Sequence, residues 1–270
     1  MCLKGKVVII TGGSGGIGQA CAEYFAARGS RVLICGRNEK RLYETSERIR
    51  GNGGLAFSFV CDVAVEEQCR ELVSYCLHEI GPPDILINNA GISMRALFVE
   101  TDLAVLHTLM DINFWGTVYV TKHSLPHLLK QKGSVIGISS IAGKKGLPGR
   151  TGYSASKFAL EGFLEALRIE NLKTGLHVLT ACPGFTSTGI RSAALGADGK
   201  PQGDSPRDEA VMMTADQVAR SIYQAVLKRR NHLVLTSKGK LTVLLNKFFP
   251  SIVDKLVYNH MADEADSPFK

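Results

Sequence analysis

Two residues one helical turn apart, Tyr153 and Lys157, are the first candidates for chemistry in this chain. Small residues surround them, and an amphipathic helical pattern continues over residues 153–173. Side chains at this spacing lie on one face of a helix, about 5–6 Å apart at Cβ. Because a nearby cation favours phenolate over phenol, the pair is typical of a tyrosine that exchanges protons. Tyrosine and lysine are also common on helix surfaces, so the pair alone leaves a purely structural interpretation open.

A glycine-rich turn near the N-terminus predicts a phosphate-binding site. The apolar run at residues 6–10 leads into Thr11-Gly-Gly-Ser-Gly-Gly-Ile-Gly18, where a helical pattern begins. Glycines permit a tight turn and close backbone approach, and the helix N-terminus offers free N–H groups to a pyrophosphate. A lone glycine fingerprint is a weak signal, but a position between the first strand and a helix favours dinucleotide binding over a merely structural turn.

The end of the second predicted strand indicates which dinucleotide is bound. An NAD site would place Asp or Glu there, but the strand at residues 31–35 is followed by Gly36 and Arg37, and Glu39 lies inside the next helix. A guanidinium can form a forked ion pair with a 2′-phosphate. We therefore predict NADP(H) rather than NAD(H), with Arg37 as a ligand. An arginine that only caps the strand end is the alternative.

Apolar runs alternate with amphipathic helical patterns along the whole chain, without an internal repeat or linker. Near-continuous apolar runs are typical of strands buried on both faces of a parallel sheet. The alternation predicts a single-domain α/β fold, with a doubly wound, Rossmann-type parallel sheet of about seven strands and helices on both faces. Strands are expected at 6–10, 31–35, 55–60, 84–88, 134–139, 177–182 and 232–236, and helices at 17–28, 39–50, 65–80, 102–130, 153–173 and 215–229.

The composition excludes several other classes of protein. The 270 residues are 45% hydrophobic and 21% charged, and no apolar run is long enough to span a membrane. The seven cysteines form no CxxC pair or Cys/His cluster with metal spacing, so we expect reduced thiols, no metal and a cytoplasmic protein without a signal peptide. The net charge of +7 is scattered, which argues against nucleic acid and suits a phosphate-bearing cofactor, a lipid surface or an ordinary basic surface.

Further motifs follow the glycine turn in a fixed order, and with them the sequence resembles the short-chain dehydrogenase/reductase family over roughly residues 5 to 235. The resemblance implies an oxidoreductase that interconverts a ketone or aldehyde and an alcohol by hydride transfer. A non-catalytic NADP(H)-binding sensor or scaffold is the alternative. The motifs are Cys61-Asp-Val63, Asn88-Asn-Ala-Gly91, Met110–Thr117 with Asn113, Gly137–Gly143 with Ser140, Tyr153-Ser-Ala-Ser-Lys157 and Pro183–Thr188.

The resemblance also implies a role for each polar residue of these motifs. Tyr153 donates a proton to the carbonyl oxygen on reduction and takes it back on oxidation, while Ser140 hydrogen-bonds the same oxygen. Lys157 holds the nicotinamide ribose and, together with a cationic nicotinamide, lowers the pKa of Tyr153. Asn113 anchors a water that links Lys157 to solvent, unless it is only a structural amide. The implied cofactor-binding residues are Gly12, Ser14, Gly16, Ile17, Gly18, Arg37, Asp62, Val63, Asn89, Ala90, Gly91, Tyr153, Lys157, Pro183, Gly184, Thr186 and Thr188.

The substrate end of the cleft is expected to be mostly apolar, which favours a hydrophobic substrate such as a steroid or a long-chain lipid. Three arginines near it, Arg95, Arg150 and Arg191, have no assigned role. The resemblance further implies a homodimer or homotetramer, assembled through the helix bearing Tyr153 and the one at 215–229. The residues expected to face the substrate are Ser93, Met94, Phe98, Ile141, Leu147 and Phe185.

Two segments interrupt the alternation of strands and helices. Residues 185–213 form a long Gly/Pro/Asp-rich connection, which predicts a lid over the substrate. We assign residues 1–237, including this lid, to the dinucleotide-binding oxidoreductase domain, and 238–270 to a C-terminal apolar and basic extension. Residues 240–258 repeat apolar side chains at helical spacing, although Pro250 should break the helix. This stretch is expected to pack over the substrate cleft or a neighbouring subunit, with weak membrane-surface contact as the alternative.

Overall fold

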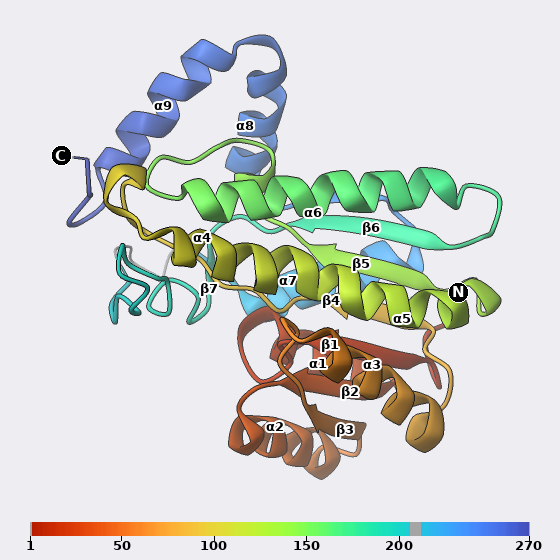
Figure 1. Ribbon diagram of the computed structural model, residues 1–270. Coiled ribbons are helices and arrows are strands. Elements are labelled where there is room, and N and C mark those ends of the chain that lie inside the picture. Colours follow the sequence, from red (N-terminus) through yellow and green to blue (C-terminus); the bar gives the residue numbers. More distant parts are fainter. Residues whose placement is uncertain (1, 206–211, 270) are drawn as a thin grey trace.

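Seven parallel strands form the central sheet of the computed structural model, which describes residues 2–205 and 212–269 (Figure 1). The predicted single-domain α/β fold with a doubly wound parallel sheet is confirmed. Every strand expected from the sequence forms within a few residues of its predicted bounds. Across the sheet the strands are β3 (Leu55–Val60), β2 (Arg31–Gly36), β1 (Val7–Thr11), β4 (Ile85–Asn88), β5 (Ser134–Ile138), β6 (His177–Cys182) and β9 (His232–Val234).

Both faces of the sheet are buried because successive side chains of a strand point to opposite faces. In β1, Val8 and Ile10 belong to one hydrophobic core, and Val7 and Ile9 belong to the other. This explains why the strands read as continuous apolar runs. The first core is covered by α1 (Gly16–Ala26), α2 (Glu39–Gly51) and α7 (Ala215–Leu227), and the second by α3 (Glu66–Tyr75), α5 (Gly116–Lys130) and α6 (Thr151–Glu170).

The direction of winding reverses between β1 and β4, which lie side by side at the centre of the sheet. In an open parallel sheet, the crevice at such a reversal, beyond the carboxyl ends of the strands, is where ligands bind. In Figure 1 the arrowheads of β5 and β6 point to the left, toward the loop that carries β7 (Thr186–Ser187). The candidate site therefore lies at this edge.

Two of the predicted helices contain a wider turn that sequence periodicity does not show. The helix expected at 65–80 is α3 followed by a π-helical segment, Cys76–Ile80. The helix expected at 102–130 consists of α4 (Leu103–Met110), a π-helical segment at Asp111–Trp115, and α5. Such segments are rare and frequently occur at functional sites. The second one contains Asn113.

The predicted lid packs against the rest of the domain over its described part. Its strand β7 pairs in parallel with β8 (Met213–Thr214). Farther along the lid, Leu195 forms single bridges with Met94 and with Pro201. Residues 206–211 of the predicted lid lie outside the described part of the chain.

The C-terminal extension forms two helices that fold back on the domain, at the top of Figure 1. They are α8 (Ser237–Phe248) and α9 (Pro250–Ala262), and Pro250 is the first residue of α9, which confirms the predicted break. The side-chain amide of Asn246 donates to the carbonyl oxygen of Lys144 at 3.3 Å, and Lys145 forms an ion pair with Asp254. Among the described residues, none of the helices combines the length and apolar character needed to cross a bilayer.

Candidate active site

Helix α6 presents Tyr153 and Lys157 to the carboxyl edge of the sheet. Its first turn lies against α4, and a Cβ atom added to Gly152 would lie 3.0 Å from Leu109 and 3.2 Å from the sulfur of Met94. The small residues near Tyr153 therefore permit close packing of the two helices. Tyr153 and Lys157 both line one cavity of about 480 Å³.

The ammonium of Lys157 is held at the end of β5. It donates a hydrogen bond to the carbonyl oxygen of Ile138 at 2.9 Å. The side chain is buried, and burial disfavours its charged form, which lowers the pKa of Lys157 to about 8 even though Cys182 and Glu161 oppose the shift. Lys157 is therefore a cation that can lose its proton near neutral pH.

Glu161, one turn farther along α6, is a polar residue of this site that the sequence analysis missed. Its carboxylate accepts a hydrogen bond from the Ser139 hydroxyl at 2.6 Å and forms an ion pair with Lys144. The Ser139 hydroxyl is therefore committed to Glu161. Ser140, the serine expected to meet a substrate oxygen, has no such contact with Glu161 and lines the cavity. The signal in the sequence was the spacing of Lys157 and Glu161 on one face of the helix.

Burial raises the pKa of the Tyr153 phenol, while a hydrogen bond with Ser140 and the charge of Arg150 act in the opposite direction. The expected lowering by Lys157 is therefore not reproduced by the protein's own groups, because desolvation of the buried phenolate is the larger effect. The hydroxyl oxygen of Ser140 accepts from the backbone N–H of Ala142 at 3.1 Å, so its hydrogen can be donated to Tyr153 or to a substrate oxygen. Tyr153 and Ser140 can meet the same carbonyl oxygen.

Asn113 is fully buried and holds the backbone that follows β4. Its amide nitrogen donates to the carbonyl oxygen of Ile92 at 3.0 Å and to the Ser156 hydroxyl at 2.9 Å. Its amide oxygen accepts from the Ile92 N–H at 2.8 Å. Both side-chain donors are thus engaged, which favours the structural interpretation of this amide. A water relay from Asn113 stays a prediction.

The glycine turn forms the other end of the cavity. Gly12 has φ +65°, a conformation that favours glycine, and a Cβ atom on Gly18 would lie 2.3 Å from the carbonyl oxygen of Gly12. Helix α1 begins directly after this turn, and no side chain caps its first N–H groups. On the opposite wall, Thr188 lies within contact distance of Gly16. The turn, the uncapped helix and this threonine suit a pyrophosphate.

Most of the predicted site residues meet in this single cavity. Its wall contains Ser140, Tyr153 and Lys157 together with the segments that follow β1, β4 and β6. The residues expected at the cofactor that line it are Gly12, Gly16, Ile17, Asn89, Ala90, Gly91, Pro183, Gly184, Thr186 and Thr188, and those that do not line it are Ser14, Gly18, Arg37, Asp62 and Val63.

The residues outside the wall have local structural contacts. Gly18 packs directly against the backbone of Gly12 in the turn. The Ser14 hydroxyl lies close to Gly36 at the end of β2. Asp62 accepts from the Ala64 N–H at 3.1 Å, in the turn that precedes α3, whose N-cap residue is Val65. Val63 is buried against Gly116.

Arg41 is a cationic residue of the cavity wall that the sequence analysis missed. It lies in the first turn of α2, where Asn38 caps the helix by accepting the Arg41 N–H at 2.9 Å. Arg37, the arginine singled out from the sequence, is exposed at the end of β2. The cap and helix signals were present in the sequence, but nothing local showed that the Arg41 side chain turns toward the glycine turn.

The substrate end differs from the expectation at several residues. Ser93, Leu147 and Phe185 line the cavity as expected. Met94 does not, because it is fully buried in a small core with Leu109. The other two expected residues also lie outside the wall: Phe98 is 57% exposed in a short 3₁₀ turn, and Ile141 packs near Gly239 of α8.

The geometry suits proton transfer next to a dinucleotide. A half-buried phenol, a serine hydroxyl and a buried ammonium lie at one end of a cleft whose other end is the glycine turn. These groups can supply and stabilise a proton at one oxygen atom, and a nicotinamide would supply the hydride when bound. Within the described residues, no group of three or more His, Cys, Asp or Glu side chains could hold a metal ion.

Comparison with known proteins shows the family to which this chain belongs. A family model for short chain dehydrogenases matches residues 6–197. The mouse protein "Dehydrogenase/reductase SDR family member 7B" is 33% identical over 271 residues, which cover 98% of this chain and 84% of the mouse protein. The Arabidopsis thaliana protein "11-beta-hydroxysteroid dehydrogenase-like 2" is 34% identical over 94% of this chain and 81% of its own.

Solved structures show the same fold. A short chain dehydrogenase/reductase from Burkholderia phymatum in complex with NAD has a TM-score of 0.84 at 24% identity and covers 93% of this chain and 96% of its own. An alcohol dehydrogenase from Thermococcus sibiricus complexed with 5-hydroxy-NADP has a TM-score of 0.76 at 24% identity, covering 85% of this chain and 95% of its own. The chain belongs to the short-chain dehydrogenase family, a family of oxidoreductases that bind a nicotinamide cofactor.

Proposed function

We propose that this protein is an NADP(H)-dependent oxidoreductase that interconverts a hydrophobic ketone or aldehyde and its alcohol. One observation carries the proposal: Ser140, Tyr153 and Lys157 share a single cavity with the glycine turn. A protein that only senses or binds the nucleotide needs the turn but has no chemical need for all three polar groups. The sensor or scaffold function is therefore the weaker alternative.

The proton steps follow from the positions of these groups. On reduction, the Tyr153 hydroxyl donates its proton to the carbonyl oxygen, and on oxidation the phenolate takes the proton back. Ser140 donates a hydrogen bond to the same oxygen and stabilises the charge that develops there. Because burial raises the pKa of Tyr153, the phenol stays protonated and ready to donate at neutral pH. Lys157 is expected to hold the cofactor ribose. Together with a cationic nicotinamide, when one is bound, it would oppose the rise in the pKa of Tyr153.

The preference for NADP(H) rests on two arginines at the adenosine end of the cleft. Arg41 lines the cavity beside Gly15 and Gly16. Arg37 follows β2 directly, where an NAD site would carry a carboxylate. A guanidinium binds a phosphate through parallel hydrogen bonds, which favours the 2′-phosphate of NADP(H). We therefore assign Arg41 as a ligand alongside the predicted Arg37.

The substrate class is inferred from the wall beyond Tyr153. Leu147, Phe185 and Ile190 are apolar residues of that wall. Pockets lined mainly by apolar side chains bind ligands through buried apolar surface. The names of the plant relatives from Arabidopsis thaliana and Sesamum indicum, which refer to 11-beta-hydroxysteroid dehydrogenase, support a steroid-like or similarly hydrophobic substrate.

The substitution Tyr153→Phe tests the proposed reaction. It removes the proton donor and keeps the ring, so kcat for reduction of a ketone and aldehyde panel with NADPH should fall at least about a hundredfold. NADPH binding, measured by fluorescence titration, should persist. Tyr43→Phe is the matched control, because Tyr43 is 60% exposed on α2. Unchanged turnover in Tyr153→Phe would show that the assigned acid is wrong.

The outer face of the C-terminal extension supports a second proposal, contact with an anionic lipid surface. Although the extension packs on the domain, it leaves a row of large apolar side chains exposed, with Lys240, Lys247 and Lys255 among them. Apolar residues bordered by lysines are typical of helices that lie in a membrane interface. The exposed apolar residues are Leu241, Leu244, Phe248, Phe249, Ile252, Leu256 and Tyr258.

Assembly and location stay predictions. Exposed apolar residues along α6, such as Phe158 and Ile169, support a homodimer or homotetramer formed through this helix. Light scattering of the purified protein would measure its mass in solution. A cytoplasmic location is the expectation from the sequence alone.

A further inference from the structure

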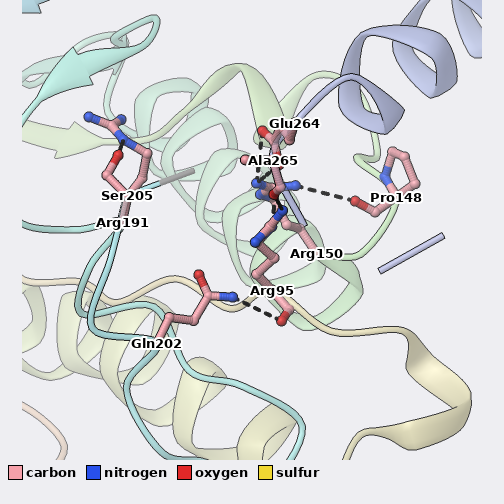
Figure 2. A network of polar contacts seen from close by, with 8 residues as sticks. All are labelled: Arg95, Pro148, Arg150, Arg191, Gln202, Ser205, Glu264 and Ala265. Carbon is pink, nitrogen blue, oxygen red and sulfur yellow. Dashed lines mark hydrogen bonds and ion pairs between the residues drawn. The ribbon is translucent and has the colours of Figure 1, made fainter. Parts of the chain in front are cut away.

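The C-terminal end of the chain packs beside the loop that carries Arg150, a residue of the cavity wall. After α9, residues 263–269 return to the loop that precedes α6, where a Cβ atom on Gly149 would lie 3.3 Å from Pro268. The carbonyl oxygen of Ala265 accepts a hydrogen bond from the Arg95 guanidinium (Figure 2). Segments that are far apart in the sequence therefore meet beside the catalytic helix.

Glu264 lies at the centre of this contact. The Nη2 atom of Arg150 donates to both carboxylate oxygens of Glu264, at 3.1 Å and 2.8 Å, and the Nε atom of Arg95 forms an ion pair with Oε2 at 3.4 Å. Figure 2 shows the carboxylate directed at these two guanidinium groups. The Glu264 side chain is only 2% exposed, and those of the arginines are 10% and 11% exposed. Two cations and one anion are thus held together away from solvent.

Arg150 belongs to the wall of the cavity, together with Leu147, Tyr153 and Phe185. It immediately precedes α6, and its charge opposes the rise that burial causes in the pKa of Tyr153, so its field reaches the phenol. An arginine without a counter-charge at this position would be a receptor for a carboxylate, because guanidinium and carboxylate form paired hydrogen bonds. In this structure the carboxylate that Arg150 binds is that of Glu264.

The third arginine near this end is also engaged. Arg191 donates to the carbonyl oxygen of Thr186 at 2.8 Å and to the Ser205 hydroxyl at 3.1 Å. The side-chain amide of Gln202, from the lid, donates to the carbonyl oxygen of Arg95 at 3.2 Å. The arginines that the sequence left without a role therefore connect the lid, the substrate loops and the C-terminus.

We propose that Glu264 is a specificity-determining residue: by pairing with Arg150 it keeps the substrate end of the cleft from attracting anions, so that uncharged carbonyl compounds are accepted and carboxylates are rejected. The inference rests on the proposed function and refines its substrate class. Glu264 itself acts through Arg150, because it is Arg150 that lines the cavity. The extension is thereby part of substrate selection.

The test compares para-acetylbenzoate with its methyl ester as NADPH-dependent substrates of the full chain. Wild-type protein should have the higher kcat/KM for the ester. Glu264→Gln removes the carboxylate charge that Arg150 contacts, so the acid-to-ester ratio of kcat/KM should rise at least about tenfold, mainly through a lower KM for the acid. The double variant Glu264→Gln with Arg150→Met should lose this gain. Asp263→Asn, an exposed neighbour with the same change of charge, should leave the ratio unchanged.

The outcomes separate this proposal from a merely structural role. Equal loss of kcat/KM for both substrates in a folded Glu264→Gln variant, with its NADPH affinity kept, would overturn it. If that variant does not fold, the measurement on wild-type protein alone still tests the proposal. A wild-type kcat/KM for the acid that equals or exceeds that for the ester would also overturn it. A wild-type protein that reduces no carbonyl compound in the panel would instead contradict the proposed function, and this inference with it.

Discussion

The ammonium nitrogen of Lys157 lies 5.8 Å from the centroid of the Tyr153 ring, on the same face of α6. From this position it donates to the carbonyl oxygen of Ile138 at 2.9 Å, which ties the helix to the end of β5. Burial raises the pKa of the phenol and lowers that of the ammonium, so both groups are pushed toward their neutral forms. The pair is thus held in a desolvated site where a cofactor charge acts strongly.

The pH dependence of stability should report the burial of Lys157. Its pKa is about 8 in the folded protein and 10.5 ordinarily, so between these values the unfolded chain binds more protons and folding becomes more favourable as pH rises. Lys157→Met removes the group whose proton binding causes this dependence on pH. Between pH 8 and pH 10.5, wild type should gain about 3 kcal/mol of unfolding free energy relative to the variant. Urea unfolding of both proteins across this range measures the gain.

Lys240→Met is the matched control for this measurement, because Lys240 is an exposed residue of α8. Its unfolding free energy should run parallel to that of wild type over the same range. A Lys157→Met curve that also runs parallel to wild type would contradict the assigned burial of the ammonium.

Cofactor selection should depend on Arg41 more than on Arg37. Arg41 lines the cavity, whereas Arg37 lies outside its wall. Removing a charged hydrogen bond to the 2′-phosphate with Arg41→Ala should weaken NADPH binding about 10- to 100-fold and leave NADH binding unchanged. Arg37→Ala should show a smaller loss. Fluorescence titration with both nucleotides gives the ratio of the NADPH and NADH dissociation constants for each variant.

Lys40→Ala removes a neighbouring exposed cation and controls for the general loss of positive charge. It should change the affinity for NADPH and NADH alike, if at all. Wild-type protein that binds NADH as tightly as NADPH would contradict the predicted preference before any variant is made.

Asn113 should be needed for stability. Asn113→Ala removes the hydrogen-bond partner of the backbone N–H and carbonyl of Ile92, and it removes the donor to the Ser156 hydroxyl, which keeps only its bond to the Tyr153 carbonyl oxygen. The expected loss is about 3 kcal/mol of unfolding free energy in urea. Asn259→Ala, at an exposed position of α9, should be nearly neutral. A loss below about 1 kcal/mol for Asn113→Ala would show that these hydrogen bonds are replaced.

The exposed face of the extension should bind anionic vesicles. Wild-type protein should co-sediment with phosphatidylglycerol vesicles, and less so at high salt, because lysines contribute to the contact. Leu244→Glu combined with Phe248→Glu should abolish binding while leaving the fold intact, since both side chains are more than half exposed. Leu172→Glu makes the same change at a residue that is 70% exposed elsewhere. Equal sedimentation of all three proteins would exclude the lipid surface.

The sequence alone was sufficient for the parts of this protein that depend on local pattern. The apolar runs, such as the one at 6–10, predict buried strands because a parallel sheet covered on both faces needs mostly apolar side chains. Tyr153, Lys157 and the glycine turn could be found because each motif is short and its spacing is dictated by one helix or one turn. The break at Pro250 follows equally from local sterics.

Only the tertiary structure decided what depends on contacts between distant segments. It placed Glu264 against Arg95 and Arg150, placed Arg41 in the wall of the cavity and buried Met94 beside Gly152 of α6. Nothing in the neighbouring residues marks these positions, because the direction of a long side chain is settled by the packing and charge of elements remote in the chain. The residues that share the cavity could therefore be predicted largely from motifs, whereas the contacts of Arg95 and Arg150 with Glu264 required the fold.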